Sequence, residues 1–221
     1  TRCLAESAKE VIAVELDDRL IPILEYTLAD YPNVKIVHGD ILEIETSEVF
    51  KTSEVSTSEV YKVIANIPYY LTSAIIRHLL ESKTKPSLIV LTVQREVAER
   101  LCAQPPEMSV LAVSVQVYGE PHIVGKIPAG AFYPKPDVES AIVRIDLFAA
   151  PPFASGEGTD QFFSMVKAGF SQKRKKLKNA LASGLKIKME EVEEMLSKAG
   201  IDSNRRAETL TVEEWKKIKR K

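Results

Sequence analysis

Short apolar runs and stretches with helical spacing alternate along the first two thirds of the chain. A β-branched run at residues 11–14 precedes apolar positions at helical intervals over residues 16–28. Strands that alternate with helices build a parallel sheet covered on both faces, so we predict an α/β fold. Further strands are predicted at residues 34–37, 61–65 and 88–93, and further helices at 72–81 and 96–101.

The pattern changes towards the end of the chain. Residues 110–118 and 140–147 have no long helix between them, and we predict that they form an antiparallel pair that closes the sheet. Beyond them, helical spacing predicts helices at 161–170, 174–181, 189–199 and 212–219. Residues 149–158 have the Pro, Ala, Ser and Gly content of a linker. The predicted domains are a Rossmann-like domain at 1–148, a linker at 149–158 and a helical domain at 159–221.

One segment is predicted to carry no chemistry. Residues 46–60 contain the sequence Thr-Ser-Glu-Val three times. A short polar repeat of this kind cannot form a core, so we expect a surface loop.

Composition narrows the class of protein. The longest apolar run, residues 87–93, is far shorter than the roughly 20 residues that a membrane helix requires, so no membrane segment is expected. Cys3 and Cys102 belong to no CxxC or Cys/His cluster, which argues against a disulfide framework and against a metal site. This cysteine usage fits the reducing cytoplasm. No long apolar stripe is left unassigned, so we expect a monomer.

Charge is divided unevenly, although the formal net charge is only −1. Residues 1–150 contain 14 Lys and Arg against 21 Asp and Glu, whereas residues 151–221 contain 16 against 10. A basic end attracts phosphate-rich partners, because Lys and Arg release condensed counterions from nucleic acid. The densest basic block, residues 172–178, is predicted to open the second helix of the tail. On charge alone, a solvated helix surface explains it equally well.

Two acidic residues follow the first two predicted strands. In open α/β sheets, ligands bind outside the carboxyl ends of the strands. Glu15 follows the first strand, where a carboxylate can accept hydrogen bonds from both ribose hydroxyls of a nucleoside cofactor. Asp40 follows the second, where it can accept a hydrogen bond from an adenine amino group. Taken singly, each is more often an ordinary turn acid.

The third strand end carries the sequence Asn66-Ile-Pro-Tyr69, which matches the Asn/Asp-Pro-Pro-Tyr type of motif in amino methyltransferases. The lone pair of adenine N6 is delocalised into the ring, so this amine is a poor nucleophile until acceptors hold its hydrogens out of plane. The Asn66 side chain and the backbone carbonyl of Ile67 or Pro68 can supply the acceptors, while Tyr69 stacks on the flipped base. As an isolated tetrapeptide, the motif is also a reasonable turn.

A longer segment makes the resemblance specific. Ala131-Phe-Tyr-Pro-Lys-Pro-Asp-Val-Glu-Ser-Ala-Ile-Val-Arg144 resembles a segment that ribosomal RNA adenine dimethylases of the KsgA type carry before their last strand. Residues 93–101, 109–116 and 206–210 are similar to other segments of this family, and the similarity extends from Thr1 to about Trp215. It implies that Phe132 forms the second aromatic wall of the base pocket, opposite Tyr69.

The resemblance also implies a fold, a reaction and a substrate. The fold is a Rossmann-like class I S-adenosylmethionine-dependent methyltransferase sheet with a small helical C-terminal domain. The reaction dimethylates N6 of two adjacent adenosines in the hairpin loop near the 3′ end of small-subunit rRNA, within a pre-30S-type particle. The implied cofactor ligands are Glu15, Asp40, Ile41 and Asn66. The implied RNA contacts are Lys173, Arg174, Lys175, Lys176 and Lys178, with Arg95 and Arg100 as weaker candidates.

One departure from the family concerns the methionine part of the cofactor. In the family, a strand and a glycine-rich loop precede the segment where this sequence begins, and Thr1 resembles the last residue of that loop. We therefore expect the 221 residues to be a truncated form. The missing loop argues against activity of the isolated chain.

Two other functions remain open. An Erm-type methyltransferase that acts on large-subunit rRNA shares the same catalytic motif, although residues 206–210 favour the KsgA type. A non-catalytic RNA-binding relative is the other alternative. An intact motif at Asn66–Tyr69, together with Phe132, argues against binding alone.

Overall fold

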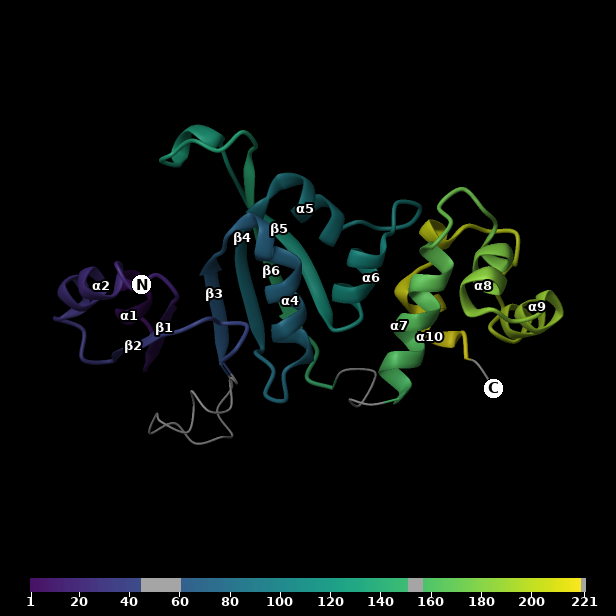
Figure 1. Ribbon diagram of the computed structural model, residues 1–221, viewed down its shortest axis with the longest axis horizontal. Helices are drawn as coiled ribbons and strands as arrows, with labels where there is room; N and C mark the ends of the chain where they lie inside the picture. Colours follow the sequence, from purple (N-terminus) through teal and green to yellow (C-terminus); the bar gives the residue numbers. More distant parts are fainter. Residues whose placement is uncertain (45–60, 151–156, 220–221) are drawn as a thin grey trace. The chain divides into compact units, whose positions relative to one another are not determined.

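A computed structural model describes residues 1–44, 61–150 and 157–219 (Figure 1). The Thr-Ser-Glu-Val repeats and most of the predicted linker lie outside the described residues. The chain divides into two compact units, and each is described by itself. Unit 1 comprises Thr1–Glu59 and Ser73–Thr84, and unit 2 comprises Val60–Thr72 and Lys85–Lys221.

Unit 1 contains a pair of parallel strands. Strands β1 (Val11–Glu15) and β2 (Val34–His38) pair in parallel along their whole length. Its helices are α1 (Arg2–Ala5), α2 (Ile21–Leu28) and nearly all of α4 (Thr72–Glu81).

Helix α2 begins later than the apolar spacing predicted. Residues 17–20 form a turn instead, in which the Leu20 N–H donates to the Asp17 carbonyl at 3.0 Å. The Asp17 carboxylate also accepts a hydrogen bond from the Arg19 N–H at 3.0 Å, which favours the turn over a helix. Pro22 lies in the first turn of α2. Proline has no N–H to donate, so it is tolerated best at such a helix start.

Unit 2 is built on a four-stranded sheet with the order β3-β4-β6-β5. Strand β3 (Lys62–Asn66) is parallel to β4 (Leu88–Gln94), and both end at the same edge of the sheet. The antiparallel strand β6 (Ser140–Leu147) begins at that edge, where Ser140 pairs with Gln94. Figure 1 shows that the segment between β5 (Gly119–Ile127) and β6 extends beyond the same edge. This edge therefore collects the ends of several predicted functional segments.

The predicted closing pair was wrong in one member. Residues 110–116 form helix α6 (Val110–Gln116), and β6 pairs antiparallel with β4 on one side and with β5 on the other. Ser109 caps this helix by accepting a hydrogen bond from the Ala112 N–H at 3.1 Å, a local signal that outweighed the β-propensity of the valines. Strand β5 escaped prediction because Pro121 interrupts its pattern; proline is accepted there because β5 is an edge strand.

The four helices predicted in the tail are all present. They are α7 (Glu157–Phe170), α8 (Leu177–Leu185), α9 (Met189–Lys198) and α10 (Val212–Lys217), in addition to α5 (Arg95–Leu101) after β4. Short 3-10 turns occur at η1 (Tyr69–Leu71), η2 (Ala129–Ala131) and η3 (Ala207–Thr209). The basic block does not open α8 as predicted. Helix α8 begins only at the buried Leu177, whose N–H donates to the Arg205 carbonyl at 2.7 Å, so most of the block precedes it.

The tail helices belong to the same compact unit as the four-stranded sheet. Helix α6 contacts α7, and the ring of Tyr118 stacks on that of Phe163 with centroids 6.3 Å apart. The Met108 N–H also donates to the Glu208 carbonyl at 3.1 Å. The domain boundary at 149–158 stays a prediction, which denaturation can test.

The carboxylate of Glu214 predicts how the stability of the tail depends on pH. Hydrogen bonds from Arg205 hold its pKa below the ordinary value of 4.5. A group whose pKa is lowered by folding stabilises the protein above its unfolded pKa, and this contribution disappears as the pH falls through the folded pKa. We expect Glu214→Gln to lower the free energy of unfolding at neutral pH, and the deficit to shrink in acid. Urea denaturation across this range measures it; a deficit independent of pH would contradict the assignment.

Two further properties concern the described ranges as a whole. None of their helices is both long and apolar enough to cross a membrane. Nor do these ranges contain a group of three or more His, Cys, Asp or Glu side chains that could hold a metal ion.

Candidate functional site

Glu15 and Asp40 lie at the carboxyl end of the β1–β2 pair in unit 1. Glu15 is the last residue of β1, and its carbonyl accepts a hydrogen bond from the Gly39 N–H at 2.9 Å. Backbone N–H groups hold both carboxylates: Asp17 donates to Glu15 at 2.9 Å, and Leu42 donates to Asp40 at 2.9 Å. In each case the bond uses one oxygen and orients the other. Both side chains are half-buried, as is the neighbouring Ile41.

This arrangement fits the nucleoside part of S-adenosylmethionine. Its ribose has two hydroxyl donors and its adenine has an amino donor, while the second oxygens of Glu15 and Asp40 accept no bond from the described residues. Ile41 adds apolar surface beside Asp40. The assignment of these three residues, and of Asn66, to the cofactor remains a prediction.

The Asn66–Tyr69 motif lies where β3 ends, at the edge that the sheet topology of unit 2 marks out. The Asn66 side chain is exposed and makes no hydrogen bond to any residue that the structure describes. Ile67 is buried and anchors the turn. The Pro68 carbonyl accepts a hydrogen bond from the Leu71 N–H at 3.0 Å, whereas the Ile67 carbonyl has no partner within the described ranges. The geometry therefore favours Ile67 over Pro68 as the backbone acceptor beside Asn66.

Tyr69 is held at two points. Its carbonyl accepts a hydrogen bond from the Thr72 hydroxyl at 3.0 Å, and its phenol oxygen lies 2.6 Å from Oγ of Ser140. Neither partner was among the predicted site residues. A signal for Ser140 was present, because it belongs to the segment 131–144 that carries the family resemblance.

Phe132 follows the η2 turn, in the segment that extends beyond the sheet edge. Its ring is half-buried, and Pro128, Pro134 and Pro136 restrict the backbone on both sides. No ring contact joins Phe132 to Tyr69 within the ranges that the structure describes. The topology brings both aromatic residues to one edge of the sheet, and their action as opposite walls of one pocket remains a prediction.

The predicted basic residues of the tail fall into two groups. Lys173, Arg174 and Lys175 are exposed between α7 and α8, and their side chains form no hydrogen bond or ion pair with the described residues. Lys176 donates to the Asn204 side chain at 2.9 Å. Lys178 is largely covered and forms an ion pair with Glu193 at 2.6 Å. The first three are therefore the best placed to contact phosphate.

The two weaker candidates for RNA contact also differ. Arg95 forms ion pairs with Glu139 at 2.5 Å and with Glu99 at 3.3 Å, which neutralise its charge locally. Arg100 is exposed and has no ion-pair partner in the described part of the chain. The surroundings of Arg95 indicate a structural role.

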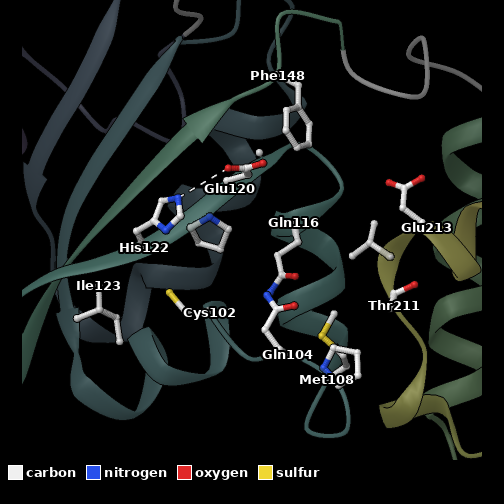
Figure 2. Close-up of a pocket in the computed structure, with 14 residues that line it drawn as sticks. Cys102, Gln104, Met108, Gln116, Glu120, His122, Ile123, Phe148, Thr211 and Glu213 are labelled. Atoms are coloured by element: carbon white, nitrogen blue, oxygen red, sulfur yellow. Dashed lines mark ion pairs between the residues drawn. The ribbon is translucent and has the colours of Figure 1, made fainter.

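A cavity of about 580 Å³ lies between β5 and the start of α10, away from the sheet edge at which β3 and β4 end (Figure 2). Its ionisable lining includes Glu120, Glu213 and His122, and neither Lys nor Arg lines it. Such a lining repels phosphate. Burial raises the pKa of the Cys102 thiol in its wall, which makes that sulfur a poor nucleophile. This cavity is therefore no candidate for the cofactor or RNA site.

The chain is similar to known rRNA methyltransferases in both sequence and structure. A protein called ribosomal RNA small subunit methyltransferase A, from Dehalococcoides mccartyi, is 45% identical over 220 residues, which is 99% of this chain and 73% of that protein. The crystal structure of the 23S rRNA methyltransferase ErmE superposes with a TM-score of 0.74 at 28% identity, covering 98% of this chain and 83% of that one. A dimethyladenosine transferase from Plasmodium falciparum gives a TM-score of 0.80 at 21% identity, covering 98% and 82%, which supports the fold.

The family model for ribosomal RNA adenine dimethylase spans nearly the whole sequence, from residue 1 to residue 220. This match agrees with the Asn66–Tyr69 motif at the sheet edge and with the relatives found by sequence. The chain therefore belongs to the ribosomal RNA adenine dimethylase family.

Proposed function

We propose that this protein transfers methyl groups from S-adenosylmethionine to N6 of adenosines in small-subunit rRNA. The observation that carries the proposal is a pair of acceptors at the end of β3, the Asn66 side chain and the Ile67 carbonyl, that accept no hydrogen bond from the described residues. Two oxygens on a rigid turn can accept both hydrogens of an adenine amino group and localise the N6 lone pair. When bound, the cofactor supplies an electrophilic methyl group.

The remaining residues orient the reactants. Tyr69, fixed at its carbonyl and its phenol, offers a ring on which the flipped base stacks. The Glu15 carboxylate accepts hydrogen bonds from the ribose hydroxyls of the cofactor, and the Asp40 carboxylate accepts one from its adenine amino group. No strong base is required, because the N-methylated ammonium product is acidic enough to release its proton to water.

The RNA target is the finer part of the proposal. The 45% identity with a small-subunit methyltransferase, against 28% with ErmE, favours small-subunit rRNA. Within it, we propose two adjacent adenosines in the 3′-terminal hairpin loop of a pre-30S-type particle. The protein would act as a monomer in the cytoplasm, where ribosomal subunits assemble.

An Erm-type reaction on large-subunit rRNA is the second candidate. The observation in its favour is the superposition on ErmE over 98% of the chain. The same acceptors and the same aromatic ring would serve either RNA, so the two candidates differ only in substrate.

Transfer of labelled methyl from S-adenosylmethionine distinguishes these functions. The protein expressed from its complete gene is incubated separately with undermethylated small and large ribosomal subunits, and the RNA is digested to nucleosides. We expect N6,N6-dimethyladenosine from the small subunit alone. Product from the large subunit alone would establish the Erm-type reaction, and no product from either, despite bound cofactor, would support a binding protein.

Removing the three exposed cations at positions 173, 174 and 175 is expected to weaken RNA binding without altering the chemistry. Each phosphate contact contributes about 0.7–0.9 to the slope of log affinity against log salt. For a variant with alanine at positions 173, 174 and 175, the plot of log affinity against log salt should therefore be shallower by roughly 2–3. Its affinity at low salt should fall by about tenfold or more. Filter binding of small-subunit RNA at several salt concentrations measures both.

A matched triple alanine variant at Lys62, Lys83 and Lys126 controls for loss of charge. These lysines are exposed and lie outside the tail. An equal change of slope in both triple variants would show that binding depends on net charge and that the basic block makes no specific contact.

A further inference from the structure

We propose that Ser140 is a positioning residue for methyl transfer: it fixes the ring of Tyr69 in the orientation that receives the target base. The inference rests on the proposed function, because it assigns Tyr69 to the stacking of adenine. It adds a residue from a distant strand, which touches neither substrate nor cofactor and acts through the phenol of Tyr69.

The burial of hydroxyl groups is the first observation. Within residues 1–44, 61–150 and 157–219, Thr72 and Ser140 are the only Ser, Thr, Asn, Gln or charged residues that are buried, with 4% and 0% of their surfaces exposed. A buried hydroxyl is unfavourable unless it is hydrogen-bonded. Both of these hydroxyls bond to one residue, Tyr69. Among the described residues, the two buried hydroxyls of serine and threonine therefore both act on a single aromatic residue.

The geometry of the two bonds is the second observation. The Thr72 hydroxyl donates to the Tyr69 carbonyl at 3.0 Å and holds the backbone. Ser140 holds the opposite end, with 2.6 Å between its Oγ and the phenol oxygen. A tyrosine ring that is fixed at both its backbone and its phenol oxygen cannot rotate freely about either side-chain torsion. Tyr69 remains only half-buried, so part of the ring is available to a ligand.

The rigidity of Ser140 is the third observation. Ser140 begins β6, between its partners Gln94 on β4 and Ile127 on β5. The preceding residue, Glu139, is tied to the start of α5 in two ways: its carbonyl accepts from the Arg95 N–H at 2.9 Å, and its carboxylate accepts from the Arg95 guanidinium at 2.5 Å. These contacts fix the position of the Ser140 hydroxyl. They also give Arg95 a structural role that requires no contact with RNA.

Loss of this bond should lower the rate of transfer more than the binding of either ligand. A ring that can rotate still stacks on a base, but it holds N6 in line with the methyl group for less of the time. Small misplacements of reacting groups reduce rates by up to about 100-fold. For one hydrogen bond that acts indirectly, we expect a loss of kcat of roughly tenfold.

A double-mutant cycle tests the proposal, using Ser140→Ala, Tyr69→Phe and the combined variant of the protein expressed from its complete gene. The two single changes remove the same hydrogen bond from opposite sides. We expect each to lower kcat by a similar factor, with KM for S-adenosylmethionine unchanged, and the combined variant to be no slower than either. Losses that multiply in the combined variant would overturn the proposal, as would a Ser140→Ala enzyme with wild-type kcat.

Fluorescence provides a readout that a purely structural role would not change. RNA with 2-aminopurine at the target adenosine should be quenched by stacking in the wild type and less quenched in both single variants. If Ser140→Ala fails to fold, Tyr69→Phe still tests the bond without altering the interior of β6, and wild-type quenching there would overturn the proposal. Ser87→Ala is the matched control, because Ser87 donates to the Tyr61 carbonyl at 3.3 Å beside the start of β4, away from the site edge.

Failure of this proposal is distinguishable from failure of the proposed function. A wild-type protein that methylates neither subunit refutes the function. A wild-type protein that methylates, beside a Ser140→Ala variant with the same kcat and the same quenching, refutes only the positioning role.

Discussion

Replacement of Asn66 by alanine is expected to lower kcat for methyl transfer by about 100-fold or more, with the unfolding temperature little changed. Removing one preorganised hydrogen-bonding group from a reacting centre typically costs a factor of about 10²–10³. Here the lost group is the side-chain acceptor for an N6 hydrogen, and the Ile67 carbonyl alone leaves the lone pair partly delocalised. Because the Asn66 side chain is exposed and forms no hydrogen bond with a described residue, its removal should not destabilise the fold. Single-turnover transfer to undermethylated small subunits measures the effect.

Two further variants make this result specific. Asn66→Asp keeps an acceptor oxygen at the same position and should retain more activity than the alanine variant. Asn179 lies on α8, and its side-chain amide forms no hydrogen bond with a described residue. Asn179→Ala should therefore leave kcat unchanged. If Asn66→Ala methylates as fast as the wild type, the Asn66 side chain is not an acceptor at the reaction centre, and the proposed role of the motif is refuted.

The elements of this fold that were predicted correctly are those with a local cause. Apolar runs placed β1, β2, β3 and β4, and the capping box of Thr211 and Glu214 marks the start of α10. The prediction failed where tertiary context decides. The run at 110–116 contains three valines but lies in a capped helix, and β5 contains a proline that only an edge position permits.

The candidate site likewise contains residues that the local sequence predicts and contacts that depend on tertiary structure. Asn66 and Tyr69 are adjacent in sequence to the end of a strand, so chemistry and position together indicated them. The bond between Tyr69 and Ser140 joins residues 71 positions apart, and no local pattern encodes such a contact. The ion pair between Lys178 and Glu193 likewise depends on how α8 packs against α9. It makes Lys178 a weaker candidate for RNA contact than its charge alone suggested.

The second large expected effect is on stability, and it concerns a buried side chain in the C-terminal helices. Replacing Trp215 by alanine is expected to lower the free energy of unfolding by about 3–5 kcal/mol. Trp215 is 1% exposed, and its ring stacks on that of Phe170 with centroids 5.7 Å apart. It also fills the space above Gly169, where an added Cβ would clash with the indole. Urea denaturation followed by circular dichroism measures the change.

Trp215→Phe is the matched variant, and its mild effect is part of the prediction. The indole Nε1 is buried without a hydrogen-bond partner among the described residues, so phenylalanine loses packing volume but no hydrogen bond. Because the tail and the four-stranded sheet form one compact unit, both variants should still unfold in a single transition. If the alanine variant instead loses its helices in an early, separate step while the sheet persists, the helices fold independently, as a domain boundary at residues 149–158 requires. The same curve therefore measures the contribution of one side chain and decides whether the sheet and the tail of unit 2 fold as one domain or two.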